Sequence, residues 1–314
     1  MMTTAFVFPG QGSQAVGMLR ELAAAYASVS ETFRQASDVL GYDLWKLVRE
    51  GPETELNMTE HTQPAMLAAG VAVWNVWNES GGTRPAFLAG HSLGEYTALV
   101  CSGALAFADA VGLVATRARS MQAAVPAGQG AMAAVLGLEL PVLEQVCASA
   151  ADAQVVSCAN LNAPGQIVIA GHREAVERAI AGAREAGAKR AVLLPVSVPS
   201  HCRLMMGAAD EMRAALRAVK WGRPQIPVIH NVDVATHEDA GAIVEALARQ
   251  LYEPVRWVET VQLLRARGVD MIIECGPGKV LTGLCRRIAS DLECLPVFDP
   301  VSLDAAINVS GANA

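Results

Sequence analysis

A glycine-flanked serine between an expected strand and an expected helix constrains this chain more than any other feature. Gly90-His91-Ser92-Leu93-Gly94 follows the apolar segment 86–89 and leads into a helical segment over 93–99. A G-x-S-x-G sequence in this setting holds its serine on a sharp turn, with the hydroxyl projecting from the sheet edge. The helix start supplies free N–H groups where an oxyanion can form. We therefore predict that Ser92 is a nucleophile. The alternative is a turn serine that caps the helix, because Ser92 and Glu95 also fit an S-x-x-E capping box.

A serine nucleophile needs a base, and six histidines are candidates. They are His61, His91, His172, His201, His230 and His237. His201 follows Pro199-Ser200 at the expected return from a small unit to the main one, where a loop can hold a side chain over the sheet edge. A loop histidine is more often simply solvated, so spacing alone leaves the choice of base open.

Apolar strands alternate with helical segments along most of the chain, which is typical of a parallel sheet. The expected order opens with a strand over 4–8, a turn over 9–12 and a helical stretch from 16 towards 40. Later expected elements are a buried helix over 64–77, a strand over 86–90, helices from 93 and over 204–219, strands over 228–231 and 271–274, and a last helix after 277–278.

The stretch from 130 to about 198 has a different order, β-α-β-β-α-β. Its expected strands cover 131–136, 155–159, 166–170 and 191–196, with helices over 141–150 and 173–186. This order is typical of a ferredoxin-like unit, here inserted into a larger one.

Composition excludes several classes of protein. With 52% hydrophobic and 18% charged residues, the chain has enough apolar surface for a compact core. We expect neither a membrane span nor a secretory signal, because the apolar stretches are short or interrupted and the first residues lack a basic start. The seven cysteines are odd in number and lack C-x-x-C spacing, so we expect reduced thiols and a cytoplasmic protein.

The net charge is −7, from 24 basic and 31 acidic residues, and no stretch is dense in Lys or Arg. We therefore expect no nucleic-acid partner. An acidic protein partner would be repelled by the overall charge, so it must dock on a local basic patch.

Three other patterns give only weak evidence for dinucleotide, phosphate or metal binding. Residues 10–15 fit G-x-G-x-x-A, but a dinucleotide site needs an acidic residue at the end of a second strand, and Glu31 lies within a helical stretch. Gly278-Lys279 is followed by Val280, not by Ser or Thr, which argues against a phosphate loop. No histidines lie at i, i+4 and the cysteines lack ligand spacing, so we expect no metal.

Several motifs together resemble those of malonyl-CoA:acyl carrier protein transacylases, in the order of that family. They are Phe8-Pro9-Gly10-Gln11-Gly12-Ser13-Gln14, Gly90-His91-Ser92-Leu93-Gly94-Glu95-Tyr96, Asn160-Leu161-Asn162-Ala163-Pro164-Gly165-Gln166, Val196 to His201, and Glu274-Cys275-Gly276-Pro277-Gly278. The resemblance implies an α/β-hydrolase-like core with a parallel sheet over 1–128 and 198–314, interrupted by a ferredoxin-like subdomain over 129–197. It also implies ping-pong transfer of malonyl from malonyl-CoA to the phosphopantetheine thiol of acyl carrier protein, for fatty-acid synthesis and without a cofactor.

The resemblance assigns roles to individual residues. Ser92 matches the nucleophile, His201 the general base, and Gln250 the residue whose main-chain carbonyl completes the triad. A neutral carbonyl can fix the imidazole tautomer without adding charge. The backbone N–H groups of Gln11 and Leu93 match the oxyanion hole.

Arg117 matches the arginine that pairs with the free carboxylate of malonate, a role that suits the planar guanidinium fork. On a helix Arg117 shares a face with Leu113 and Met121, which predicts partial burial. A buried arginine needs an anionic partner, and a substrate carboxylate can be one. The alternative is an ordinary surface arginine. Met121, Asn160 and Asn162 are further substrate-binding candidates, although each asparagine also suits a turn.

Two rival functions remain, a serine hydrolase and a carrier-protein docking module with a relic site. An esterase would leave an apolar pocket where Arg117 is expected, and the joint presence of Ser92, His201, Gln11 and Arg117 argues against decay. Val198 to His201 resembles the fatty-acid type of the family rather than the polyketide types. One extra methyl group in an apolar pocket changes the discrimination between malonyl and methylmalonyl by only about 1–3 kcal/mol. We expect a monomer whose carrier contacts are Lys189, Arg190, Arg286 and Arg287.

Overall fold

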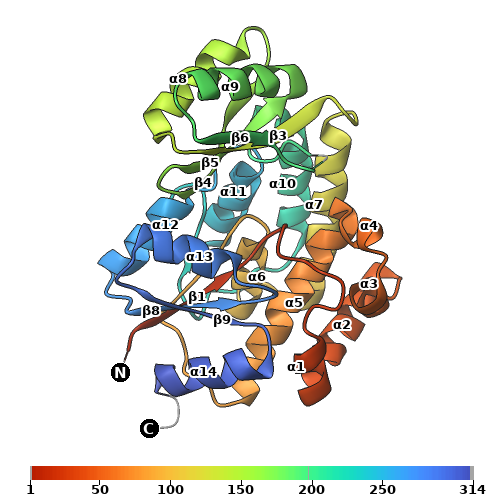
Figure 1. The fold of residues 1–314 in the computed structure, drawn as a ribbon. Helices are drawn as coiled ribbons and strands as arrows, with labels where there is room; N and C mark the ends of the chain where they lie inside the picture. The colour runs from red at the N-terminus through yellow and green to blue at the C-terminus, as the bar shows by residue number, and fades with distance from the viewer. Residues whose placement is uncertain (1, 197, 312–314) are drawn as a thin grey trace.

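Two sheets organise the chain (Figure 1), whose computed structural model describes residues 2–196 and 198–311. The larger sheet has five strands in the order β7-β2-β1-β8-β9, and its neighbouring strands run parallel. The smaller sheet has four strands in the order β4-β5-β3-β6, and its neighbours run antiparallel. This mixed architecture, a parallel sheet with a small antiparallel unit, confirms the predicted fold class.

Helices cover both faces of the parallel sheet. Its strands are β1 (Thr4–Phe8), β2 (Phe87–Gly90), β7 (Val228–Ile229), β8 (Met271–Cys275) and β9 (Glu293–Val297). All residues of the central strand β1 are buried, as expected for a strand enclosed on both sides. Phe6 and Phe8 face one apolar cluster, where Phe6 meets Trp77 edge-on at 4.9 Å, whereas Ala5 and Val7 face the other.

The helices of the larger unit follow the chain around this sheet (Figure 1). They are α1 (Arg20–Ala25), α2 (Ala27–Leu40), α3 (Leu44–Glu50), α4 (Glu53–Leu56), α5 (Thr59–Glu79), α6 (Gly94–Cys101), α7 (Phe107–Ala124), the 3-10 turn η1 (Arg203–Met205), α10 (Met206–Ala218), α11 (Ala240–Gln250), α12 (Trp257–Ala266), α13 (Val280–Ile288) and α14 (Pro300–Ser310). Within the described residues, none of these helices has both the length and the apolar character required to span a bilayer.

The smaller unit has the β-α-β-β-α-β order that the sequence predicts. It comprises β3 (Gly130–Leu136), α8 (Leu140–Ala151), β4 (Val156–Ala163), β5 (Gln166–His172), α9 (Arg173–Glu185) and β6 (Arg190–Leu193). Helices α8 and α9 lie side by side on one face of the sheet and share an apolar cluster with it (Figure 1). The expected domain boundary at 197/198 falls on residue 197, which lies outside the described residues.

Three expectations about individual elements are wrong. The single helix from 16 towards 40 is divided, because Tyr26 between α1 and α2 has extended backbone angles, φ −130° and ψ 114°. The strand expected over 155–159 continues as β4 to Ala163. The last helix is α14 rather than the one after Gly278, and β9 precedes it.

Candidate active site

Ser92 lies on a strained turn between the end of β2 and the start of α6. Its φ is +52°, a left-handed value that is unusual for a residue with a Cβ. The end of β1 packs directly against this turn, where the His91 N–H donates to the Phe8 carbonyl at 2.9 Å. A Cβ at Gly94 would lie 2.0 Å from the same Phe8 oxygen. The flanking glycine is therefore required by the close approach of two backbones.

Asn231, which follows β7, holds this turn from the other side. Its Oδ1 accepts from the Ser92 N–H at 2.8 Å, and its Nδ2 donates to the Gly90 carbonyl at 2.7 Å. The carboxylate of Glu95 turns away from Ser92, towards His230 Nδ1 at 2.7 Å. The alternative of a capping box between Ser92 and Glu95 is therefore wrong. Sequence reasoning missed Asn231, because no motif surrounds it.

His201 reaches Ser92 from the loop that precedes η1. Its Nε2 lies 2.8 Å from Ser92 Oγ, and its Nδ1 lies 2.6 Å from the Gln250 carbonyl oxygen. Since a carbonyl can only accept, Nδ1 carries the proton and Nε2 is free to accept from the serine hydroxyl. Burial first, and then the positive charge of Arg117, lower the pKa of His201 to about 3. The imidazole is therefore neutral near pH 7 and able to take a proton.

Arg117 projects from α7 to the same hydroxyl. Its Nη2 lies 3.2 Å from Ser92 Oγ and donates to Gln250 Oε1 at 3.0 Å, while Nη1 donates to Gln63 Oε1 at 2.8 Å. Only 1% of the residue is exposed, so the alternative of a surface arginine is wrong and the burial exceeds the partial burial expected. That burial lowers the pKa of the guanidinium.

Gln11 and Leu93 lie at the ends of two elements that meet beside the serine turn. Gln11 is exposed in the turn after β1, and Leu93 is buried at the start of α6. Within the part of the chain that the structure describes, neither backbone N–H donates to a backbone carbonyl. N–H groups without backbone acceptors beside a serine turn are the kind of donors that stabilise an oxyanion.

The other substrate-binding candidates are dispersed. Met121 is buried beside Arg117, and Gln63 Nε2 lies 3.8 Å from its Sδ. Asn162 Oδ1 lies 2.8 Å from Nε2 of His91, the residue before the nucleophile. Asn160 Oδ1 is buried and has no protein partner among the described residues. Met121 and Asn162 therefore each contact a neighbour of a site residue.

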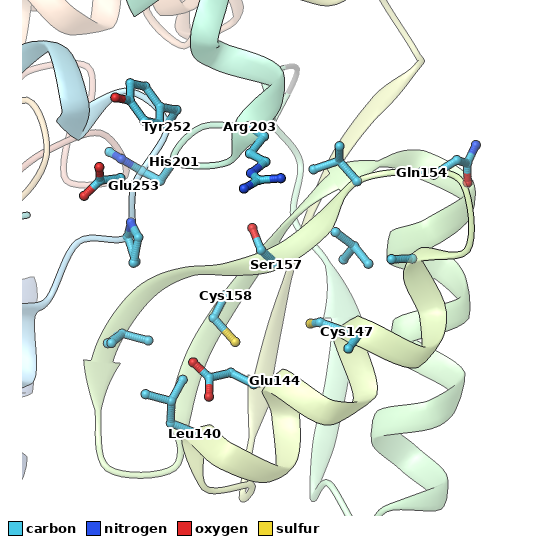
Figure 2. A pocket seen from close by; sticks show the side chains of 16 residues that line it. Leu140, Glu144, Cys147, Gln154, Ser157, Cys158, His201, Arg203, Tyr252 and Glu253 are labelled. Atoms are coloured by element: carbon cyan, nitrogen blue, oxygen red, sulfur yellow. The ribbon is translucent and has the colours of Figure 1, made fainter.

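A cavity of about 510 Å³ lies behind His201, between α8, β4 and the loop after α11 (Figure 2). His201, Arg203, Ser157 and Tyr252 contribute to its lining, whereas Ser92 and Arg117 do not. The cavity thus adjoins the residue that bonds the serine hydroxyl. Among residues 2–196 and 198–311, no three His, Cys, Asp or Glu side chains are grouped so as to hold a metal ion.

Fold and site together define a class of enzyme. A serine on a strand–turn–helix junction of a parallel sheet, hydrogen-bonded to a neutral histidine, is the arrangement of enzymes that form an acyl-serine ester. The buried cation next to the hydroxyl favours an acyl group with a negative charge.

Comparisons with known proteins agree with this class. A model described as an acyl transferase domain matches residues 5–294. A malonyl CoA-acyl carrier protein transacylase of Salmonella typhimurium is 55% identical, covering 98% of this chain and 99% of that protein. The Bacillus subtilis protein of the same name is 46% identical, over 98% of this chain and 97% of that protein.

Solved structures give the same result. An acyl carrier protein S-malonyltransferase of Vibrio cholerae has a TM-score of 0.95 and 58% identity, with 96% of this chain and 99% of that chain covered. A malonyl-transacylase in complex with a type II PKS acyl carrier protein has a TM-score of 0.97 and 54% identity, with 98% and 99% covered. The chain therefore belongs to the acyl transferase family, as the resemblance predicted, and is an acyltransferase whose relatives are malonyl CoA-acyl carrier protein transacylases.

Proposed function

We propose that this protein transfers a malonyl group from malonyl-CoA to the phosphopantetheine thiol of an acyl carrier protein, for fatty-acid synthesis, through an ester on Ser92. One observation carries the proposal: Ser92 Oγ lies 2.8 Å from His201 Nε2 and 3.2 Å from Arg117 Nη2. A base and a buried cation thus both contact the oxygen that reacts. The relatives named as malonyl CoA-acyl carrier protein transacylases support the same substrates.

In the first half-reaction, Ser92 Oγ attacks the thioester carbon of malonyl-CoA while His201 Nε2 takes the hydroxyl proton. The N–H groups of Gln11 and Leu93 donate to the oxyanion. The product of this attack is a tetrahedral intermediate. When it collapses, the carbon–sulfur bond breaks, and coenzyme A leaves with the proton from His201. The Gln250 carbonyl stabilises the imidazolium during the step, because it accepts from Nδ1 throughout.

The second half-reaction reverses these roles. His201 takes the proton of the carrier's pantetheine thiol, and the thiolate attacks the malonyl-Ser92 ester. Ser92 Oγ then leaves and recovers its proton from His201. Since one product leaves before the second substrate is used, the kinetics are ping-pong. The residues carry out each step without a cofactor.

Arg117 separates this proposal from a serine hydrolase. A guanidinium beside Ser92 Oγ can pair with the malonyl carboxylate during both half-reactions. A site for uncharged acyl groups would bury an apolar side chain there, because an unpaired buried cation is costly. Asn162 supports the site through its contact with His91, and Met121 packs beside Arg117.

We propose a docking site for the carrier protein at one end of the small sheet. Leu136 pairs with both Gln166 and Arg190, and Arg287 of α13 donates to the Gln166 side chain. Lys189 is adjacent, since its N–H donates to the Leu136 carbonyl at 2.8 Å. The proposed carrier contacts are the exposed basic residues Lys189, Arg190, Arg286 and Arg287, where an acidic carrier can bind. The solved complex of a similar transacylase with its carrier protein supports such a partner.

We also propose that the chain divides into two units at 128/129 and 197/198, that it is a monomer, and that it is cytoplasmic. Docking by a local patch needs only one copy of the chain. Asn162 Oδ1 of the small unit lies 2.8 Å from Nε2 of His91, the residue before the nucleophile, so a carrier bound at the sheet end can present its thiol close to Ser92.

The test is the intact mass of the protein after brief mixing with malonyl-CoA, methylmalonyl-CoA and acetyl-CoA in competition, followed by peptide mapping. We expect a malonyl adduct on the Ser92 peptide that carrier protein discharges faster than water does. Ser92→Ala should give no adduct. No adduct on the wild-type protein would indicate a relic docking module, and discharge by water first would indicate a hydrolase.

A further inference from the structure

Among the described residues, each side chain that accepts a hydrogen bond from Arg117 is neutral. Its hydrogen-bond partners are Gln63 Oε1, Gln250 Oε1 and Ser92 Oγ. Among the residues that the structure describes, no carboxylate oxygen lies within 4.0 Å of its nitrogens. Buried guanidinium groups are usually paired with a carboxylate, because an uncompensated charge in the interior is costly. The free protein therefore carries a buried cation without a direct counter-ion.

A buried carboxylate is nearby but is held by other groups. Glu95, on α6, is 0% exposed. Its Oε1 lies 2.7 Å from His230 Nδ1, and its Oε2 accepts from the Asn231 N–H at 3.1 Å. Glu95 is close enough for its charge to act on Arg117. The absence of an ion pair therefore reflects how Glu95 is held rather than a lack of acidic residues.

The side chain of Gln250 lies between the two charges. Its Oε1 accepts from Arg117 Nη2 at 3.0 Å, while its Nε2 donates to Glu95 Oε2 at 2.8 Å. This orientation is fixed by chemistry, since a guanidinium only donates and a carboxylate only accepts. An amide is suited to this position, because a carboxylate would face Glu95 and an ammonium would face Arg117.

Gln63 holds the other end of the guanidinium in the same way. It is 0% exposed near the start of α5, and its Oε1 accepts from Arg117 Nη1 at 2.8 Å. Its Nε2 faces the Met121 sulfur at 3.8 Å, a weak acceptor without charge. A glutamate would fit the same volume and would neutralise Arg117 permanently.

We propose that Gln63 and the side chain of Gln250 are selectivity-determining positioning residues, which orient Arg117 through neutral oxygens and so reserve its charge for the carboxylate of the acyl group. This inference rests on the proposed function, in which Arg117 binds malonyl. A malonyl carboxylate supplies the missing counter-ion on binding, whereas an acetyl group cannot. The preference for a carboxylate-bearing acyl group thus arises because the protein leaves the charge of Arg117 without a counter-ion.

The test compares Gln63→Glu with Gln63→Met in the full-length protein. The measured quantity is the ratio of kcat/KM for malonyl-CoA to kcat/KM for acetyl-CoA, which does not depend on the folded fraction. We expect Gln63→Glu to lower this ratio roughly 30-fold or more, because an internal ion pair competes with the substrate carboxylate. Gln63→Met removes the same hydrogen bond without adding charge and should lower the ratio less than about tenfold.

An unchanged ratio in Gln63→Glu, or an equal fall in both variants, would overturn the inference. Failure of the proposed function is a different result, in which the wild-type protein forms no malonyl-Ser92 ester. If the wild type forms that ester and Gln63→Glu keeps the wild-type ratio, only the inference about Gln63 and Gln250 fails.

Discussion

Two site residues hold backbone conformations that are unfavourable for side chains with a Cβ. Ser92 has φ +52° and His201 has φ +62°. Such conformations cost on the order of 1 kcal/mol each and persist only where surrounding contacts impose them. Asn231 holds the first through the Ser92 N–H and the Gly90 carbonyl, and the Gln250 Nε2 donates to the Ser92 carbonyl at 2.9 Å. For the second, the Leu251 carbonyl accepts from the His201 N–H at 2.9 Å. The strain brings the hydroxyl and imidazole into contact before any substrate binds.

Replacing Arg117 tests the carboxylate clamp. Arg117→Ala should lower kcat/KM for malonyl-CoA roughly 30-fold or more, because a desolvated charge pair is lost. Transfer of acetyl should fall much less. Arg119→Ala is the control, since Arg119 is exposed on the same helix and its side chain donates to Thr116 Oγ1. Equal losses for both acyl groups in Arg117→Ala would exclude the clamp.

The lowered pKa of His201 predicts a pH-dependent stability. Its pKa is near 6.5 in the unfolded chain and about 3 when folded, so between these values the unfolded state binds the extra proton. The free energy of unfolding should therefore fall as pH drops through 6.5 towards 3. Urea midpoints measured near neutral pH and near pH 5 should differ less in His201→Asn than in the wild type. An equal difference in both proteins would contradict the assignment.

At the scale of elements, the site depends on how closely β1 approaches the turn before α6. Gly94→Ala should lower the free energy of unfolding by at least about 3 kcal/mol, because its Cβ would lie 2.0 Å from the Phe8 oxygen. Gly112→Ala, inside α7 with no atom within 4 Å of the added Cβ, should raise it by about 0.5–1 kcal/mol. Urea unfolding measures both. A tolerated Gly94→Ala would mean that the β1–α6 contact is loose.

Elements were predicted well where the pattern is local and strong. The alternating strands and helices of the small unit follow from short apolar runs separated by turns. The edge strand β9 was missed because Pro296 interrupts its apolar run, and proline is tolerated in a sheet mainly at an edge. The break at Tyr26 has no glycine or proline to announce it, since its cause is the packing of α1 and α2 on different neighbours.

At the scale of the whole molecule, a net charge of −7 makes the basic sheet end distinctive. Reversing three charges there to Glu should raise the KM for carrier protein roughly tenfold at low salt and weaken its salt dependence. The residues to reverse are Lys189, Arg190 and Arg287. The control reverses three exposed residues on α2 and α3, far from the small unit (Figure 1). These are Arg34, Lys46 and Arg49. Salt-dependent turnover that matches the control would exclude the patch.

The sequence alone determined the class of fold, the family and the nucleophile turn. These follow from signals within a few residues, namely hydrophobic period, glycine turns and family motifs. Only the tertiary structure decided the full burial of Arg117, its neutral partners and the hydrogen bonds from Asn231 to the serine turn. Ser92 bonds residues 109 and 139 positions away, His201 and Asn231. Such contacts depend on how strands and helices pack across the sheet, because no local pattern encodes which distant side chains meet at its edge.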